Sequence, residues 1–144
     1  MNPKCFLLLA AICLAACNQN KTSDRDLRSI DVQATASMLA GKTNLLGQNG
    51  KAGTWVDPRT AAAFDKGHIP DAIHMPFASV RDRHDELKPY RVIIVYGDGY
   101  RDVVAEGMAK RLIELGHKDV YVLRGGLQAW TSAGNTLQSA APTG

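Results

Sequence analysis

The order of apolar and polar residues along the chain predicts short strands that alternate with helices. Val92–Val95 are four consecutive apolar residues, a run typical of a strand that is buried on both faces of a sheet. Apolar residues then recur at helical spacing over 102–115, where Val104 and Met108 fall on one face, and Gly116 follows where helices commonly end. A buried strand followed by such a helix is the repeating unit of a parallel sheet.

The same alternation recurs along most of the chain. The pattern predicts strands at 54–56 and 119–123, helices at 30–40, 61–64, 79–87 and around 127–130, and a loop at 47–53. Pro70 and Pro76 exclude a helix across the segment 66–76. We therefore expect a single α/β domain over 29–138, with a central parallel sheet flanked by helices, and a disordered tail at 139–144.

The N-terminal segment has the features of a secretory signal. Lys4 supplies a positive charge, and the apolar run over 6–16 is too short to span a bilayer. The run ends in Leu-Ala-Ala-Cys17, which resembles a bacterial lipobox, a signal that is cut before the cysteine so that the thiol becomes lipidated. An ordinary signal peptide cut near the two alanines is the alternative. The lipobox predicts a signal peptide at 1–16, a palmitate-type acyl chain on Cys17, and a flexible tether over 17–28.

A lipid on Cys17 predicts a location as well as a membrane anchor. The protein is expected in a bacterial cell envelope, and the resemblance to Gram-negative lipoproteins, with Asn18 after the cysteine, favours the outer membrane facing the periplasm. Cys5 and Cys13 would leave with the signal peptide. The mature chain would then hold no free thiol, so it could form no disulfide and offer no thiolate nucleophile.

Charge and histidine spacing exclude other classes of function. The 17 basic and 14 acidic residues are mixed along the chain and give a net charge of +3 without a basic stripe, so nucleic-acid binding is not expected. None of the four histidines has the i,i+4 spacing of a helical zinc site. They are His68, His74, His84 and His117. Because no cysteine of the mature chain could join them, we predict neither a metal site nor a cofactor.

Several motifs, in order, resemble the rhodanese-like family over roughly residues 28–137. Val56-Asp57-Pro58-Arg59 resembles the family's Asp-Val-Arg at the end of a strand. Phe64 followed by residues 67–73 resembles its Gly-His-Ile-Pro-Gly-Ala-Ile signature, with Asp71 in place of the usual glycine. Residues 115–130 resemble its Leu-Gly-Tyr segment with the later Gly-Gly and Ala-Trp pairs. The resemblance implies the family's α/β fold and, in its ordinary members, sulfur transfer from a catalytic cysteine.

The loop that carries that cysteine in the family reads Tyr96-Gly97-Asp98-Gly99-Tyr100-Arg101 here. The family pattern is Cys-x-x-Gly-x-Arg-Ser. Matching Gly99 and Arg101 places Tyr96 at the cysteine position, whereas matching the tyrosine that ends the strand places Gly97 there, and the sequence leaves both alignments open. Sulfur transfer needs a thiolate that holds sulfur as a persulfide, which neither a phenol nor a glycine provides. We therefore predict that no residue of the loop is catalytic.

The remaining features of the loop still suggest a binding site. Arg101 and the backbone amides around Gly97 and Gly99 are candidates for holding an anion or another ligand. Two carboxylates, Asp98 and Asp102, oppose anion binding through their charge. In the alternative interpretation, which we favour, Asp102 caps the following helix and Arg101 pairs with a carboxylate.

The other motif residues are expected to be structural. Asp57 and Arg59 stand at the end of a strand, where they would fix neighbouring loops, and His68 would hydrogen-bond within its turn. The sequence therefore predicts a membrane-anchored, non-catalytic binding or scaffold module that contacts a protein, a peptide or a small anion through the former active-site crevice. One alternative is a sulfurtransferase-type enzyme with an atypical loop. The other is a structural role in the envelope without a ligand.

Overall fold

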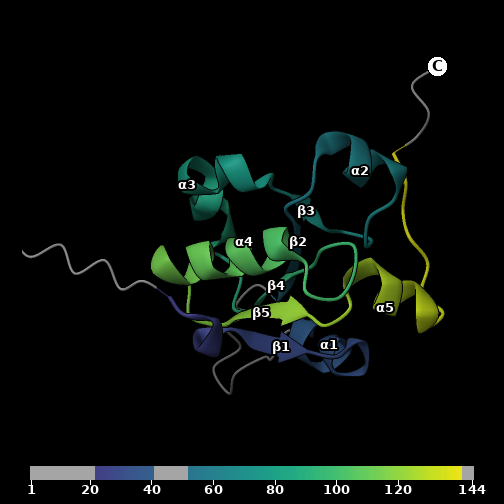
Figure 1. Ribbon diagram of the computed structural model, residues 1–144, viewed down its shortest axis with the longest axis horizontal. Helices are drawn as coiled ribbons and strands as arrows, with labels where there is room; N and C mark the ends of the chain where they lie inside the picture. Colours follow the sequence, from purple (N-terminus) through teal and green to yellow (C-terminus); the bar gives the residue numbers. More distant parts are fainter. Residues whose placement is uncertain (1–21, 41–51, 141–144) are drawn as a thin grey trace, which may run out of the picture.

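The computed structural model describes residues 22–40 and 52–140 (Figure 1). The predicted signal peptide, Cys17 and most of the predicted loop at 47–53 lie outside the described residues. Within them, parallel strands form one sheet in the order β1-β5-β4-β2-β3. The strands are β1 (Arg28–Ile30), β2 (Thr54–Asp57), β3 (Ile73–His74), β4 (Ile93–Val95) and β5 (Val120–Leu123). The predicted α/β domain with a central parallel sheet is confirmed.

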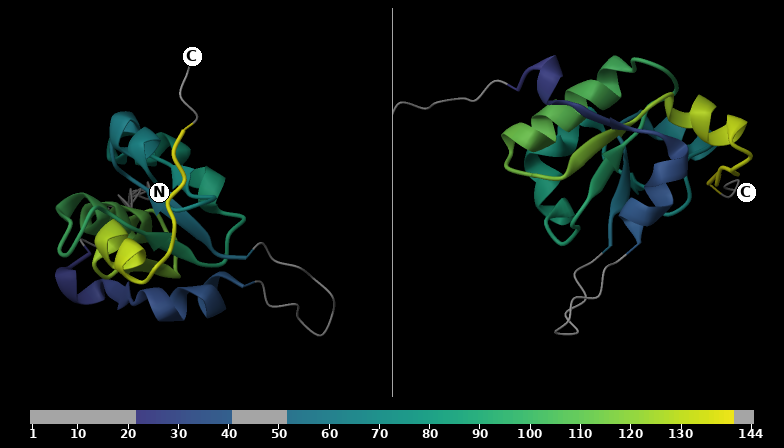
Figure 2. Two further views of the ribbon diagram at one scale, coloured as in Figure 1. Left: turned by 90° about the vertical axis from the view of Figure 1, so that its right-hand side faces the viewer. Right: turned by 90° about the horizontal axis from the view of Figure 1, so that it is seen from below.

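Helices cover both faces of the sheet (Figure 2). One face packs against α1 and α5, and the other packs against α3 and α4, while α2 connects β2 to β3. The helices are α1 (Val32–Leu39), α2 (Ala61–Lys66), α3 (Val80–Arg83), α4 (Val103–Glu114) and α5 (Gly126–Ser132). Short 3-10 turns are η1 (Asp24–Asp26), η2 (Phe77–Ser79) and η3 (His84–Leu87). The helix predicted over 79–87 is therefore α3 continued by a tighter 3-10 turn.

The core lies in two layers separated by β4. Ile93 and Val95 belong to the layer beneath α4, and Ile94 belongs to the layer beneath α1 and α5. All of β4 is buried, as a strand in the middle of a parallel sheet should be. The inward face of α4 differs from the prediction, because Val104 is 40% exposed and Ala105 is buried in its place. Met108 is fully buried as predicted, so the difference is confined to the first turn of the helix.

The ordered domain begins earlier than the sequence suggested. Arg28–Ile30 form the edge strand β1, which pairs with β5, whereas the prediction ended a flexible tether at Arg28 and began a helix at Ile30. Leu27 packs against the core, and Asp24 forms an ion pair with Lys110 of α4. No sign of β1 is visible in the sequence because a strand of three residues with one buried side chain has no alternation of apolar and polar residues. Its partner strand β5 also lies far along the chain.

The C-terminal end also extends beyond the predicted boundary. Gln138 forms an antiparallel bridge with His68, and the amide of Ala140 donates to the carbonyl of Asp65 at 3.0 Å. Part of the predicted tail at 139–144 therefore has defined contacts with the domain. No helix in the described ranges is both long and apolar enough to cross a membrane.

Candidate functional site

The loop that follows β4 lies at a topological switch point of the sheet. Strands β4 and β2 are neighbours, but β4 leads through α4 to β5 on one side and β2 leads to β3 on the other. Ligands of open α/β sheets bind beyond the carboxyl ends of strands at such a point. The loop 96–101 follows β4, and Asp57 ends β2 with Arg59 just after it, so the sheet brings these predicted residues together.

Asp102 fills the centre of this loop with its carboxylate. As the N-cap of α4, its Oδ1 accepts hydrogen bonds from the amides of Val104 and Ala105, both at 3.0 Å. Its Oδ2 accepts the amide of Asp98 at 2.9 Å. These donors come from the loop and from the helix N-terminus, the two sources of positive potential in such a turn. The Asp102 carboxylate therefore already uses three amide donors that an anion in this turn would need.

The two alternative cysteine positions have different surroundings. A Cβ added to Gly97 would lie 2.1 Å from Cγ of Asp102 and 2.3 Å from its Oδ2, so a side chain at 97 would meet that carboxylate. Tyr96 instead points into the core, where its ring packs edge-on against Trp55 and its hydroxyl accepts the amide of Ile69 at 3.1 Å. A side chain at position 97, and not at 96, would therefore face the centre of the loop.

The phenol of Tyr96 is held in its neutral form. Burial is the main cause that raises the pKa of Tyr96, and the negative charge and hydrogen bond of Asp57 raise it further. A neutral, fully buried phenol is neither a nucleophile nor a binding group for a ligand. Tyr96 acts as a core residue that links β4 to the turn containing Ile69.

Arg59 joins the ends of β2 and β4. Its guanidinium makes a two-pronged contact with the buried carboxylate of Asp57, with Nε–Oδ1 at 3.0 Å and Nη2–Oδ2 at 2.7 Å. Nη1 donates to Asp98 at 2.8 Å and Nη2 also donates to the carbonyl of Gly67 at 2.8 Å. Burial lowers the pKa of Arg59, but Asp57 and then Asp98 outweigh it, so the net shift is upward. These contacts engage every nitrogen of the guanidinium.

His68 fixes the neighbouring turn. Its ring lies flat on Phe64, with centroids 3.7 Å apart, and its Nδ1 is 2.8 Å from the carbonyl of Phe64. The backbone amide of His68 donates to Gln138, so the turn is attached to both α2 and the C-terminal segment. The imidazole is buried, and its contacts are with α2.

Arg101 is exposed and has a left-handed backbone conformation, with φ of 52°. Within the part of the chain that the structure describes, it forms no ion pair with a carboxylate. It lines a cavity of about 290 Å³ together with Gly97, Gly99, Tyr100 and Arg124. This cavity lies on the β5 side of the loop, away from Arg59. Arg101 and the loop glycines thus line one cavity, and Asp57, Arg59 and His68 are not among the residues that line it.

A family model for the rhodanese-like domain matches residues 42–133. The chain belongs to the rhodanese-like domain family. It is 31% identical over 119 residues to a sulfurtransferase of Allochromatium vinosum, covering 82% of this chain and 99% of that protein. It is 28% identical over 74 residues to the thiosulfate sulfurtransferase GlpE of Coxiella burnetii, covering 51% of this chain and 67% of that protein.

Solved structures show the same rhodanese-like fold. The crystal structure of the Alr3790 protein from Anabaena superposes with a TM-score of 0.62 at 29% identity, over 77% of this chain and 80% of that one. Thiosulfate sulfurtransferase from Pseudomonas aeruginosa gives a TM-score of 0.63 at 22% identity over 79% of this chain and 20% of that one, which is a likeness of fold.

Two contacts of this rhodanese-like loop with α5 were not predicted from the sequence, the close approach of Gly126 and a pair of backbone hydrogen bonds. Gly126 approaches the loop so closely that a Cβ on it would lie 2.2 Å from the carbonyl of Gly97. That carbonyl accepts the amide of Leu127 at 2.9 Å, and the carbonyl of Asp98 accepts the amide of Gln128 at 3.1 Å. The start of α5 therefore holds the loop from behind. The Gly-Gly pair at 125–126 is the sequence signal for this close approach.

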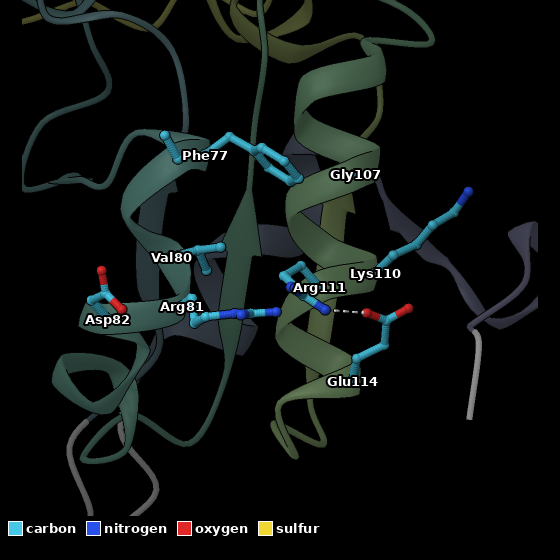
Figure 3. A pocket seen from close by; sticks show the side chains of 9 residues that line it. Phe77, Val80, Arg81, Asp82, Gly107, Lys110, Arg111 and Glu114 are labelled. Atoms are coloured by element: carbon cyan, nitrogen blue, oxygen red, sulfur yellow. Dashed lines mark hydrogen bonds and ion pairs between the residues drawn. The ribbon is translucent and has the colours of Figure 1, made fainter. Parts of the chain in front are cut away.

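A second cavity, of about 480 Å³, lies between α3 and α4 (Figure 3). Phe77 points across it toward Gly107, and Val80 and Arg111 lie below them. It contains none of the residues that the sequence singled out. Its opening is lined by both basic and acidic side chains, including the ion pair between Arg111 and Glu114 at 3.0 Å.

Proposed function

We propose that this rhodanese-like domain is a non-catalytic binding module in which Asp102 has replaced the anion that the loop would otherwise hold. The observation that carries the proposal is the position of the Asp102 carboxylate. It accepts the amides of Asp98, Val104 and Ala105 and lies where a side chain at Gly97 would begin. We assign Gly97 to the family's cysteine position on this ground.

The chemistry of the loop supports the absence of sulfur transfer. A thiolate or persulfide at position 97 would need the amide donors that Asp102 already uses. It would also lie beside a second negative charge, which raises the pKa of a thiol instead of lowering it. The relatives named as sulfurtransferases favour the alternative, an enzyme of that class, but in a chain cleaved and lipidated at Cys17 such an enzyme would need its thiol from another molecule.

The exposed residues on the outer side of the loop are the proposed contact surface. Tyr100 is 69% exposed and Val103 is 79% exposed, and Arg101 lies between them in the sequence. Exposed aromatic and arginine side chains beside an apolar residue are enriched in protein–protein contacts. We propose a protein or peptide partner for this surface, with a small anion as the competing ligand at Arg101.

We further propose that the domain is attached to the envelope membrane through a lipid on Cys17. The support is the sequence Leu-Ala-Ala-Cys17. Cys17 precedes Thr22, the first described residue, by five positions, an interval that spans at most about 18 Å when extended. An anchor there would hold the domain close to the membrane surface, in the periplasm if it lies in the outer membrane.

The decisive experiment is a thiosulfate:cyanide sulfurtransferase assay on the full chain with Cys5, Cys13 and Cys17 changed to serine. This chain contains no thiol, and we expect no thiocyanate above the buffer blank and no persulfide by mass spectrometry. GlpE is the positive control. Turnover that survives repeated purification and is lost in Arg101→Ala would support the sulfurtransferase alternative and overturn the proposal.

A further inference from the structure

The histidines His84 and His117 meet near the amino end of β5, at the end of the sheet opposite the loop that follows β4. His84 begins η3, and His117 lies between α4 and β5, where the strand starts. Nδ1 of His84 is 3.3 Å from Nε2 of His117, and the two rings are perpendicular with centroids 5.5 Å apart. The two residues are 33 positions apart in sequence, so only the fold places them together, and the sequence-based prediction of no metal site could not take their contact into account.

The distance between these nitrogens fits a metal ion as well as a shared proton. A tetrahedral Zn²⁺ with Zn–N bonds of about 2.0–2.1 Å holds two ligand nitrogens about 3.3 Å apart. We propose that His84 and His117 form a two-imidazole chelating site for Zn²⁺ or another divalent transition-metal ion. The inference is independent of the proposed function of the loop.

The surroundings of His84 favour the required tautomer. Oδ1 of Asp85 is 3.5 Å from Nε2 of His84, so the proton is attracted to Nε2 and the lone pair of Nδ1 faces His117. A metal-bound His117 would coordinate through Nε2 and carry its proton on Nδ1. If Nε2 of His117 donates to His84 in the metal-free state, metal binding moves this proton to Nδ1 of His117 through solvent. Lys88 pairs with the same oxygen of Asp85 at 2.8 Å, and its positive charge opposes a cation nearby.

The site supplies only two protein ligands. No cluster of three or more histidine, cysteine, aspartate or glutamate side chains suited to a metal occurs within 22–40 and 52–140. Water must complete the tetrahedron, and the His84 side chain is 19% exposed, so an ion can enter and exchange. His68 and His74 do not compete, because their rings stack with Phe64 and each directs a nitrogen to a backbone carbonyl.

Zinc binding to the untagged full chain tests this directly. Cys5, Cys13 and Cys17 are changed to serine in every sample, so that no thiol competes for the metal. Isothermal titration should give one Zn²⁺ per chain and no binding of Mg²⁺, which prefers oxygen ligands. The imidazole NMR signals of His84 and His117 should shift with Zn²⁺, and those of His68 and His74 should not.

Substitutions assign the ligands. Loss of an outer partner of a metal-bound histidine typically weakens binding by about 10–100-fold, and loss of a ligand should cost at least as much. We expect losses of this size in His84→Gln and in His117→Gln, and a weaker loss in Asp85→Asn. Asp82→Asn, the same chemical change three positions earlier, should bind zinc as the parent does. Absence of binding with millimolar Zn²⁺, or an affinity in both histidine variants equal to that of the parent, would overturn the proposal.

Discussion

The carboxylate of Asp102 lies where a side chain on Gly97 would have to begin. Cγ of Asp102 is 2.1 Å from the ideal position of a Cβ on Gly97, and Oδ2 accepts the amide of Asp98 at 2.9 Å. The same carboxylate caps α4 through its other oxygen. Asp102 thus accepts the free amides at the start of α4 and leaves no space for a side chain at position 97. A substitution at either position therefore affects the other.

Restoring a thiol should therefore require two substitutions. Gly97→Cys alone places the thiol against a carboxylate, and we expect its pKa at or above the ordinary value of about 8.5. Gly97→Cys with Asp102→Ser keeps a helix cap and frees the amides. The thiol pKa should then fall to within about 3.5–7.5, measured from the pH dependence of iodoacetamide alkylation.

The matched control for this pair is Tyr96→Cys, made in the same background with serine at positions 5, 13 and 17. Because position 96 is buried, its thiol should react only after unfolding. A fast-reacting thiolate near neutral pH in Gly97→Cys alone would show that Asp102 does not block the amide donors of the loop. An unreactive thiol in the double variant would show that the loop has lost its anion site altogether.

The sequence predicted most of this architecture because its strongest signals are local. The apolar run Val92–Val95 contains β4, and Asp102 together with Gly116 marks the ends of α4. The edge strand β1 was missed because Arg28 and Ser29 are exposed and their pairing depends on β5, about ninety residues away. Contacts between distant segments produce no local pattern of apolar and polar residues in the sequence.

The candidate site was only partly predictable for the same reason. The sequence pointed to the loop after β4 and to Asp57 and Arg59, and it shows no cysteine in that loop. The hydrogen bond of Asp102 to the Asp98 amide and the approach of Gly126 to Gly97 depend on how the loop folds back on itself. The contact between Asp98 and Arg59 joins two strands, and the spacing of these residues gives no indication of it.

Arg59 should contribute to stability through its buried partner and not through its exposed one. Arg59→Ala leaves the carboxylate of Asp57 buried without a counter-charge, which should cost about 3–5 kcal/mol in free energy of unfolding. Asp98→Ala removes a carboxylate that is 71% exposed from the same guanidinium and should cost at most about 1 kcal/mol. Urea denaturation followed by circular dichroism measures both. Equal losses would show that the buried pair is not the stabilising contact.

The partial exposure of Val104 in α4 can be tested with the buried Leu112 as the control. Leu112→Ala removes a fully buried side chain and should cost about 2–5 kcal/mol. Val104→Ala changes a residue that is 40% exposed and should cost under about 1 kcal/mol. The sequence pattern placed Val104 on the buried face of this helix, together with Met108. A loss of several kcal/mol from Val104→Ala in denaturant melts would favour that earlier placement of the helix.

Attachment to the membrane should depend on Cys17 and on no other cysteine. If the lipobox is used, the wild-type chain should sediment with the envelope, and mass spectrometry should find an acylated N-terminal cysteine. Cys17→Ser should remove the acyl chain and the anchor, because the hydroxyl cannot form the thioether. Cys13→Ser, four positions earlier in the apolar run, keeps the cleavage site and should leave the membrane fraction unchanged. The folded domain should be unaffected in both variants, since its described contacts begin after position 21. An unmodified N-terminus at another residue in the wild-type chain would contradict lipidation without affecting the proposal for the loop.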